Sequence, residues 1–392
     1  MLKVLIFSPL ALEYGRGGEI SCIELSAGLN KFYKITLLET NILPGNKLLT
    51  YSVIKNKLKG VKRNNKIRYY SLKLLDKIFT FPYPQDIIKL LKMIHKNDII
   101  YFSESTIKNN LLFVFSSLLH RRGKFIVGYR KPFHINKRFS LYNFKNRMTI
   151  LIFLIFKKRL YHHTISKHAK YFLHNFYSSE RITHITHGVV LDDYINNNMN
   201  VKNKNNLSFI YVGNIDKPHK GVDILISGID LFLTEHKKLD VLFEFCGTGP
   251  LESDLKMLEE KYPNHIKYHG YVSNEKIAEY YKRNDVFLFS SRKEPFGRVI
   301  LEALASELVV ICSKTIGSIE ILTNKDFAFF IKDFRPQAIE EKINEIYNLW
   351  VRDSKWLVEL QKSAKDYVFQ YYNFSIELEL FQKLISRVSN ER

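Results

Sequence analysis

Short apolar runs alternate with longer helical stretches along most of the chain, and this alternation limits the possible folds most strongly. Helical stretches such as GEISCIELSAGLNKF and VDILISGIDLFLTEH separate the runs. Such βαβ units build parallel sheets covered by helices on both faces. The sequence therefore predicts an α/β protein. The predicted strands are KVLIFS, YKITLLE, DIIYFS, KFIVGY and HTIS in the first half, and LSFIYVG, VLFEFCG, IKYHG, DVFLFS and LVVICS in the second.

A polar stretch, NNNMNVKNKNN, separates the two strand series and has the composition of a linker. We expect a Rossmann-like, doubly wound domain over residues 1–190, a linker over 191–206 and a second such domain over 207–370. Residues 371–392 are expected to form a helix that packs back toward the first domain. Two domains also suit a chain of 392 residues. They would face each other across a cleft at the carboxyl ends of their strands, where ligands bind in such folds.

Cysteine usage and hydropathy indicate a reducing compartment. The three cysteines are far apart and odd in number, which argues against a disulfide framework. The opening MLKVLIFSPLAL lacks a basic start and a cleavage site, so we interpret it as a first strand. The apolar run ILIFLIF is far shorter than the roughly 20 residues that a membrane-spanning helix needs. We therefore expect a cytoplasmic protein.

Positive charge is concentrated in one part of the chain. Residues 41–180 hold 28 Lys and Arg against 5 Asp and Glu, within a total formal charge of +21. This asymmetry predicts an anionic partner for that part alone. In LYNFKNRMTILIFLIFKKRLYHH, cations flank an apolar run with aromatics, as in helices that lie on a membrane surface, although a helix buried in the first domain explains the run equally well. Basic patches with aromatic residues also bind single-stranded nucleic acid, so that class stays open.

The stretch SSRKEPFGRVILEALASELVV holds the residues with the clearest chemistry. Glu294 precedes a Pro-Phe-Gly turn, and Glu302 follows eight positions later within an apolar helix. Amide N–H groups at the start of that helix suit a diphosphate. Carboxylates on either side suit the hydroxyls of a sugar and a ribose, so the layout fits a nucleotide sugar. Either glutamate could instead form an ordinary ion pair. The amides concerned are those of Phe296, Gly297, Arg298 and Val299.

This stretch resembles the E-x7-E signature of retaining glycosyltransferases of the GT-B fold, family 4 (glycosyl transferases group 1). The likeness extends over most of the chain and is more specific in the second half. It implies transfer of a sugar from a nucleotide-diphosphate sugar to an acceptor, with retained anomeric configuration. It is carried by EPFGRVILEALA, YVGNIDKPHKGVDILISGI, FCGTGPLESDL and YHGYVSNEKIAEYY in the second half, and by GRGGEISCIELSAGL, TISKHAKYFL and THGVVLDDYI in the first.

The resemblance implies roles for individual residues. Glu294 would bind the hydroxyls of the donor sugar, Glu302 those of the ribose, and Lys220 the diphosphate. His134 is a candidate for the histidine that many relatives place near the anomeric carbon, although an ordinary loop histidine is the simpler interpretation. The implied catalytic residues are Glu294, Lys220 and His134, and the other implied donor-binding residues are Gly17, Gly18, Asn214, Gly247, Gly249, Tyr271, Val272, Phe296, Gly297, Arg298 and Glu302.

The chain departs from the family pattern at several positions. Asn214 stands where relatives often have Arg, with Lys217 and Arg16 as possible substitutes. Ser306-Glu307 replaces a small-Gly pair, and Gly317 alone remains of a Gly-Gly loop. These changes put the donor sugar in doubt.

Neither a nucleophile nor a metal follows from the sequence. Six of the 13 histidines fall between His162 and His187, but none has the spacing of a metal motif. Asp192-Asp193 is not a separated D-x-D. Without a metal motif we expect metal-independent chemistry without a cofactor. The resemblance implies a reaction on one face of the sugar without an enzymatic nucleophile, so we assign none.

Together these features predict a transferase of cell-envelope polysaccharide (lipopolysaccharide among them) or of glycolipid synthesis. Its acceptor would be lipid-linked or membrane-bound, and its basic half would attach peripherally to the inner face of the cytoplasmic membrane. No nucleic-acid partner is expected, because no recognition motif is present. Two alternatives remain, a non-catalytic relative that acts as a partner subunit and a basic nucleic-acid-binding protein.

Overall fold

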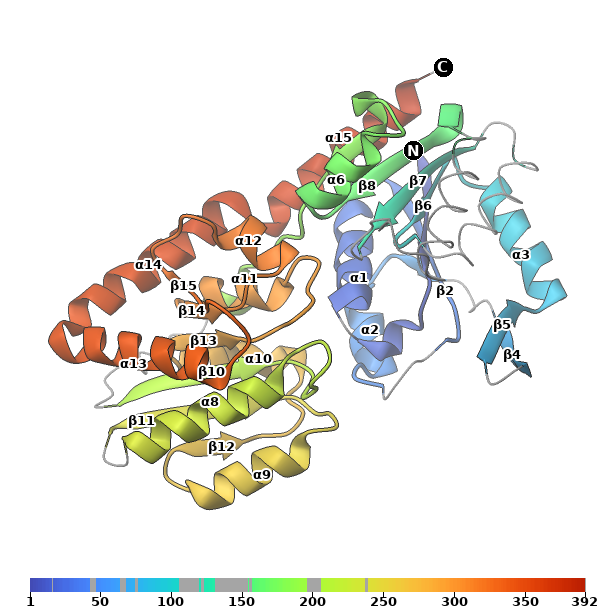
Figure 1. Cartoon of the computed structure of the whole chain (residues 1–392). Helices are drawn as coiled ribbons and strands as arrows, with labels where there is room; N and C mark the ends of the chain where they lie inside the picture. The colour runs from blue at the N-terminus through green and yellow to red at the C-terminus, as the bar shows by residue number, and fades with distance from the viewer. Residues whose placement is uncertain are drawn as a thin grey trace. The chain divides into compact units, whose positions relative to one another are not determined.

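The computed structural model (Figure 1) describes residues 1–15, 17–42, 47–63, 68–74, 77–105, 120, 123–130, 154, 157–195, 206–236 and 239–391. The chain divides into two compact units. Unit 1 comprises Met1–Thr186 and Glu377–Arg392, and unit 2 comprises His187–Ile376.

Unit 1 is built on a seven-stranded parallel sheet in the order β3-β2-β1-β6-β7-β8-β9. The order reverses between β1 and β6, which makes their carboxyl ends a topological switch point. A separate antiparallel hairpin joins β4 (Tyr69–Leu74) and β5 (Lys77–Pro82). The sheet strands are β1 (Lys3–Ser8), β2 (Lys34–Glu39), β3 (Lys62–Arg63), β6 (Ile99–Phe102), β7 (Lys124–Tyr129), β8 (Leu160–Thr164) and β9 (Ile182–His184).

Helices cover both faces of this sheet, because successive strand residues point to opposite sides. Val4 and Ile6 of β1 pack with α1, α2 and α15, whereas Leu5 and Phe7 pack with α3 and α6. Figure 1 shows α1 and α3 on opposite sides of the strands. The helices are α1 (Gly17–Leu29), α2 (Tyr51–Lys57), α3 (Pro84–His95), α6 (Lys167–Leu173) and α15 (Phe374–Asn390), with the short turns η1 (Leu12–Tyr14), η2 (Lys157–Arg159) and η3 (Ser179–Arg181).

Unit 2 repeats this plan on a six-stranded parallel sheet in the order β12-β11-β10-β13-β14-β15. Its switch point lies between β10 and β13. The strands are β10 (Leu207–Val212), β11 (Val241–Cys246), β12 (Ile266–Tyr268), β13 (Val286–Phe289), β14 (Val309–Cys312) and β15 (Ala328–Phe330).

The helices of unit 2 pack in two groups. Helix α8 contacts α9 and α13, and α11 contacts α10 and α14. The predicted α/β class, with two parallel sheets flanked by helices, is confirmed. The helices are α7 (Asp192–Ile195), α8 (Val222–Glu235), α9 (Glu252–Lys261), α10 (Asn274–Lys282), α11 (Arg298–Ala305), α12 (Ile316–Leu322), α13 (Pro336–Arg352) and α14 (Ser354–Tyr371).

Within the described ranges, no helix is both long and apolar enough to cross a membrane. The run ILIFLIF lies outside the described residues except for Leu154, which packs against the core of unit 1. The choice between a buried and a surface helix there stays open.

Glu307 follows α11 with a φ of 62°, a left-handed conformation that disfavours side chains. This is the position at which the family pattern has glycine. The Glu307 carboxylate contacts the Lys365 ammonium of α14 at 2.6 Å. The substitution therefore affects the C-terminal end of α11, at the opposite end of the helix from Gly297.

Replacing Glu307 by Gly is expected to raise the free energy of unfolding by about 0.5–1 kcal/mol, since relief of the left-handed strain exceeds the loss of an exposed ion pair. Glu307→Ala is the matched control, because it loses the ion pair but keeps the strain. Urea denaturation of both variants measures the difference. If the free energy of unfolding of Glu307→Gly is equal to or lower than that of Glu307→Ala, the backbone at position 307 is not strained.

Candidate functional site

The candidate site of unit 2 lies at the switch point, where β10 and β13 end side by side. The loop after β10 runs to Gly221 before α8, and the loop after β13 runs to Gly297 before α11. Ser290 joins the two loops, since its Oγ donates to the Lys220 carbonyl at 2.8 Å. The carboxyl edge of the sheet therefore presents two loops and two helix starts together.

Lys220 and Glu294, two of the residues predicted to be catalytic, form an ion pair at this edge. The Lys220 Nζ donates to the Glu294 Oε2. Their side chains are 26% and 17% exposed, so both stay within reach of a ligand. Because the two residues are 74 positions apart in sequence, the fold itself brings them together.

The loop that carries Lys220 is shaped by Asp216, a residue that the sequence analysis missed. Its Oδ1 accepts hydrogen bonds from the backbone N–H groups of His219 and Lys220, each at 2.9 Å. Burial alone would raise the pKa of Asp216, but hydrogen bonds from Lys220, Asn214 and His219 outweigh burial and lower it. Asp216 is thus held ionised as the anchor of the loop. An Asp at the head of a turn, where its side chain can accept from backbone N–H groups a few residues on, was the available signal.

Asn214 and Arg292 also maintain this loop. The Asn214 amide donates to Asp216, so in this structure the side chain acts within the loop. Arg292 binds Asp223 at the start of α8 through two parallel hydrogen bonds of 2.6 and 2.9 Å. Lys217 offers its carbonyl to Arg292 and has an exposed side chain. Both loops are therefore tied to α8 as well as to each other.

The Pro-Phe-Gly turn is fixed by a close backbone approach. The Phe296 ring is buried and packs edge-on against His187, with centroids 5.5 Å apart. A Cβ on Gly317 would lie 1.9 Å from the Phe296 carbonyl oxygen, and the Gly317 N–H donates to the Glu294 carbonyl at 3.2 Å. Gly317 therefore allows α12 to hold the turn that carries Glu294. Arg298 opens α11 directly after Gly297.

Glu302 has protein partners of its own. Its Oε1 accepts a hydrogen bond from the Arg298 Nε at 3.1 Å, and the Tyr281 hydroxyl lies 3.5 Å from its Oε2. Burial and the nearby Glu302 raise the pKa of Tyr281 well above its ordinary value, so the hydroxyl keeps its proton. The ion pair is the alternative that the sequence left open. Each carboxylate oxygen accepts more than one hydrogen bond, so a ribose hydroxyl can still join.

The remaining donor-binding candidates of unit 2 follow β11 and β12. Gly247 accepts a hydrogen bond from the Tyr268 hydroxyl at 3.0 Å, and Gly249 donates to Glu252 at 2.8 Å. Tyr271 is 43% exposed, and Val272 is half-buried. Gly247 and Gly249 therefore have a local structural role that the sequence analysis did not include.

The other predicted residues belong to unit 1 or lie outside the described residues. Gly17 and Gly18 form the first turn of α1, so the expected glycine-rich loop is the start of a helix. A Cβ on Gly17 would meet no atom within 4 Å. His134 and Arg16 lie outside the described residues.

A buried carboxylate in β11, Glu244, is the second group that the sequence analysis missed. Its oxygens accept hydrogen bonds from Arg283 at 2.7 and 2.9 Å, from Asn284 at 2.7 Å and from His269 at 3.1 Å. Burial would raise the pKa of Glu244, but hydrogen bonds from His269, Arg283 and Asn284 lower it to about 2.

The hydrogen bonds of the Glu244 carboxylate are expected to make the stability of the protein fall in acid. Because its folded-state pKa lies below the ordinary value of 4.5, its stabilisation is complete above that pH and is lost as pH falls toward about 2. The shift corresponds to about 3 kcal/mol. In Glu244→Gln, urea unfolding from neutral pH to about pH 3 is expected to show a shallower loss of stability with acid. Glu341→Gln, which removes an exposed ion pair with Lys332, is the control and should keep the wild-type slope.

The first pair of the histidine-rich segment lies in the core of unit 1. His162 and His163 are fully buried on β8. Their Nδ1 atoms lie 2.9 Å from the hydroxyls of Tyr129 and Tyr101 respectively. Among the described residues, the group with metal-ligand spacing is instead Glu235, His236 and Glu340. It comprises the end of α8 and a residue of α13, and includes none of the predicted site residues.

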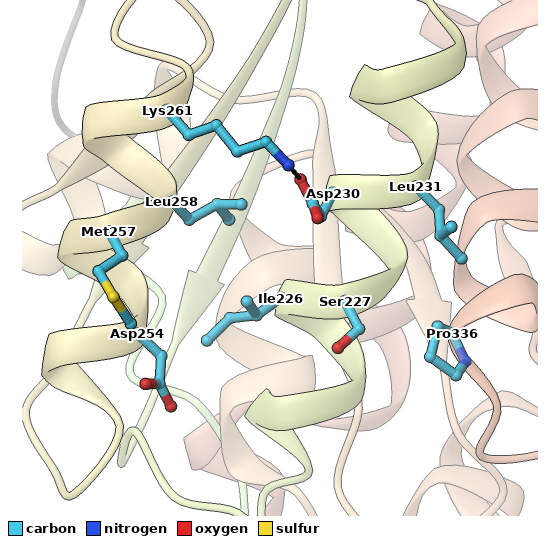
Figure 2. A pocket seen from close by; sticks show the side chains of 9 residues that line it. All are labelled: Ile226, Ser227, Asp230, Leu231, Asp254, Met257, Leu258, Lys261 and Pro336. Carbon is cyan, nitrogen blue, oxygen red and sulfur yellow. Dashed lines mark hydrogen bonds and ion pairs between the residues drawn. The ribbon is translucent and has the colours of Figure 1, made fainter.

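A pocket of about 470 Å³ lies between α8 and α9. Figure 2 shows Lys261 of α9 reaching toward Asp230 of α8, and the contact is 2.5 Å long. Ile226 and Leu258 lie between the two helices in the same view. None of the predicted site residues lines this pocket, so it is separate from the candidate site.

Comparison with known proteins agrees with this geometry. Residues 195–367, which hold the loops of the candidate site, match the family described as glycosyl transferases group 1. The chain is 34% identical over 106 residues to the phosphatidylinositol N-acetylglucosaminyltransferase gpi3 subunit of Schizosaccharomyces pombe, covering 26% of this chain and 23% of that protein. It is 28% identical over 141 residues to the capsular polysaccharide biosynthesis glycosyltransferase CapM of Staphylococcus aureus, covering 35% and 36%. These matches thus span well under half of either relative.

Among solved structures, the chain resembles Anabaena Alr3699/HepE, crystallised with UDP and glucose. The TM-score is 0.74 with 17% identity, over 98% of this chain and all of that one. The likeness shows that the whole chain has the GT-B fold. The family match itself covers residues 195–367, within unit 2.

Proposed function

We propose that this protein is a retaining glycosyltransferase that moves a sugar from a nucleotide-diphosphate sugar to an acceptor hydroxyl without a metal. The observation that carries the proposal is the Lys220–Glu294 pair, which stands at the switch point beside the start of α11. A cation and a helix N-terminus suit a diphosphate, and a carboxylate suits sugar hydroxyls. The match of residues 195–367 supports the same assignment.

In the proposed reaction, the bond between the anomeric carbon and the diphosphate oxygen breaks, and the acceptor oxygen bonds to that carbon. The acceptor proton leaves with the departing diphosphate. Lys220 and the first amides of α11 would stabilise the negative charge that develops on the diphosphate. Glu294 would position the sugar, and Glu302 would position the ribose. The chemistry rests on orientation and charge stabilisation, so no protein nucleophile is required.

The donor is proposed to be a UDP-sugar, because the structurally similar HepE was crystallised with UDP and glucose. The acceptor is proposed to be a lipid-linked or membrane-bound glycan of the cell envelope or a glycolipid. The name of CapM includes capsular polysaccharide biosynthesis, and the name of the gpi3 subunit includes phosphatidylinositol. A non-catalytic partner subunit would not need the Lys220–Glu294 pair to remain accessible.

A panel of UDP-, GDP- and ADP-sugars tests this function. Thermal shift identifies the donor that binds, and slow hydrolysis of that donor shows that the anomeric bond is activated. Stabilisation and hydrolysis with one nucleotide class is expected. An absence of both across the panel would refute the proposal.

A basic pocket in unit 1 supports a membrane-facing role at the cytoplasmic face. It has a volume of about 940 Å³. Lys3, Lys34 and Lys62 open β1, β2 and β3, so the pocket lies at the amino edge of the sheet. A six-residue strand is roughly 20 Å long, so the pocket lies about that far from the carboxyl edge of the same sheet. The other charged or titratable lining residues are Lys89, Lys92, His95, Lys96, Asp98 and His120.

Anionic vesicles test this surface. Each cation near anionic lipid adds about 1 kcal/mol of attraction, so reversing Lys89, Lys92 and Lys96 to Glu should weaken co-sedimentation with phosphatidylglycerol vesicles by more than about tenfold. Reversing Lys332 and Lys342 of unit 2 is the control and should have little effect. Donor hydrolysis should be unchanged in both. Vesicle binding that is insensitive to salt and to the reversal of Lys89, Lys92 and Lys96 would refute this role. Tighter binding to single-stranded RNA would favour the nucleic-acid alternative.

A further inference from the structure

The pocket at the amino edge of the unit 1 sheet is lined almost entirely by charges of one sign. Among the described residues that line it, Asp98 is the single acid, and its carboxylate already accepts a hydrogen bond from the Lys3 backbone N–H at 2.8 Å. The side chains of the lining lysines form no ion pair with another described residue. These six lysines are Lys3, Lys34, Lys62, Lys89, Lys92 and Lys96.

The alternation of side chains along the strands explains why the sheet lysines face α3. Lys3 shares one face of β1 with Leu5, and Lys34 shares one face of β2 with Leu38. Both leucines belong to the core cluster that Leu90 of α3 completes. The face that packs against α3 therefore changes from apolar to cationic at its amino edge. Lys3 and Lys34 are also direct partners in the parallel pairing of β1 and β2, so their backbones lie about 4.8 Å apart.

Helix α3 supplies the opposite wall of the pocket. Lys89, Lys92 and Lys96 follow one another at spacings of three and four residues, which places them along one stripe of the helix. Because α3 leads directly into β6, its C-terminal end lies at the amino edge of the sheet. The dipole of that end amounts to about half a negative charge, so it offsets only a small part of the lysine charge. Asp86 acts on Lys89, but it is already bound by Arg68 at 2.9 Å.

The rest of unit 1 cannot neutralise this pocket. None of the other described carboxylates of unit 1 lines it. Between positions 16 and 156, the residues that the structure does not describe include one acid, Asp76, against ten lysines and arginines. Whatever their positions, these residues can contribute a single carboxylate. The surplus of positive charge is therefore a property of the sequence as well as of the described residues.

The size and chemistry of the pocket indicate the kind of ligand that fits. Its volume of about 940 Å³ is that of a small-molecule site. Lysine binds phosphate as a point charge and lacks the planar fork with which arginine selects carboxylates. A phosphate monoester carries a charge of about −1.5 to −2, so six lysines and one aspartate match two or three phosphate groups.

We propose that this pocket is a polyphosphate site, which binds one molecule that carries two or more phosphate groups. The lysines of the sheet edge contact one phosphate, and those of α3 contact another. In doubly wound folds the reacting ligands bind at the carboxyl ends of the strands. The occupant of this amino-edge pocket is therefore an effector or an anchor and not the sugar donor. The site goes beyond the proposed transfer reaction, and it differs from diffuse attraction to a membrane because only the pocket lysines take part.

Calorimetric titration of the full chain with inorganic tripolyphosphate tests the site. The wild-type protein is expected to show saturable binding near physiological ionic strength. Combined replacement of Lys34, Lys62 and Lys92 by Gln should raise the Kd at least about tenfold, because charge-assisted hydrogen bonds are lost. The matched control replaces the exposed lysines in and just after α2, which removes the same charge outside the pocket and should leave the Kd within about twofold. These control residues are Lys55, Lys57 and Lys59.

Two further measurements separate polyphosphate binding from other effects. The ligand-free pocket variant should melt at or above the wild-type temperature, because repulsion among the lysines is relieved. Inorganic monophosphate should bind at least about tenfold more weakly than tripolyphosphate, since it reaches one wall of the pocket only. Equal weakening in the two triple variants, equal affinity for the two phosphates, or no saturable binding to the wild-type protein overturns the proposal.

Vesicles identify the source of the phosphates. One set contains phosphatidylglycerol and the other phosphatidylinositol 4,5-bisphosphate, at the same total surface charge. Tighter binding to the bisphosphate vesicles, with release by tripolyphosphate, assigns the site to a lipid headgroup. Tripolyphosphate binding without that preference assigns it to a free polyphosphate. Binding to the pocket in a protein that is inactive against all nucleotide sugars would confirm this site and refute only the glycosyltransferase function.

Discussion

Replacing Glu294 by Gln is expected to lower the rate of sugar transfer by about 10²-fold, as misplacement of a substrate does in other enzymes. The substitution keeps the size of the side chain but removes the charge that pairs with Lys220 and accepts from the sugar. Steady-state kinetics should show the loss mainly in kcat rather than in the KM for the donor. Circular dichroism and the melting temperature should stay close to wild type, because both partners of the pair are partly exposed.

The control for Glu294 is a glutamate in the same unit with an ordinary ion pair. Glu341→Gln breaks the exposed contact with Lys332 and should leave transfer unchanged. A Glu294→Gln enzyme with wild-type kcat would remove Glu294 from the active site. If the melting temperature of Glu294→Gln falls strongly, the ion pair with Lys220 stabilises the fold and does not act mainly in catalysis.

Replacing Gly247 by Ala is expected to destabilise unit 2 by about 3–5 kcal/mol, which combines backbone strain with severe overpacking. Gly247 has a φ of 145°, and a Cβ there would lie 1.7 Å from the Gly213 carbonyl oxygen. That oxygen belongs to the loop after β10, so the backbone itself would have to move. Urea denaturation followed by circular dichroism measures the loss.

Gly270→Ala separates the two causes. Gly270 also has a positive φ, 63°, but a Cβ on it would meet no atom within 4 Å. Only the left-handed strain then applies, and a loss of about 1–2 kcal/mol is expected. Equal losses in the two variants would show that the close approach of the loops after β10 and β11 contributes nothing.

The strands were predictable because buried parallel strands are nearly continuous apolar runs. β1 (KVLIFS) and β7 (KFIVGY) coincide with their predicted runs, and the other eight predicted strands overlap observed ones. β3, β9 and β15 have only two or three residues, too few for a period to appear. The hairpin of β4 and β5 was missed because its runs, YYSLKL and KIFTFP, mix lysine into a basic segment that was interpreted only through its charge.

The sequence could group candidate residues that one motif keeps close together, but not residues that meet only where loops come together in space. The spacing of Glu294 and Glu302 indicated one turn and one helix, but nothing in the sequence indicated that Lys220 would pair with Glu294. Asp216 and Glu244 were missed because their importance comes from partners on other segments. Nothing in the sequence singled out Arg130, because its burial and its hydrogen bond to the Gly18 carbonyl depend on the pairing of strands.

The position of α15 affects the order in which the protein can fold during synthesis. Its residues Phe381, Leu384 and Val388 complete the core on one face of the unit 1 sheet, and the Lys124 Nζ binds the Val388 carbonyl at 2.7 Å. The ribosome makes all of unit 2 before it makes the part of this helix that belongs to unit 1, which begins at Glu377. Until then, one apolar face of the unit 1 sheet stays uncovered, whereas every segment of unit 2 is already present. Unit 2 is therefore expected to reach its native state first.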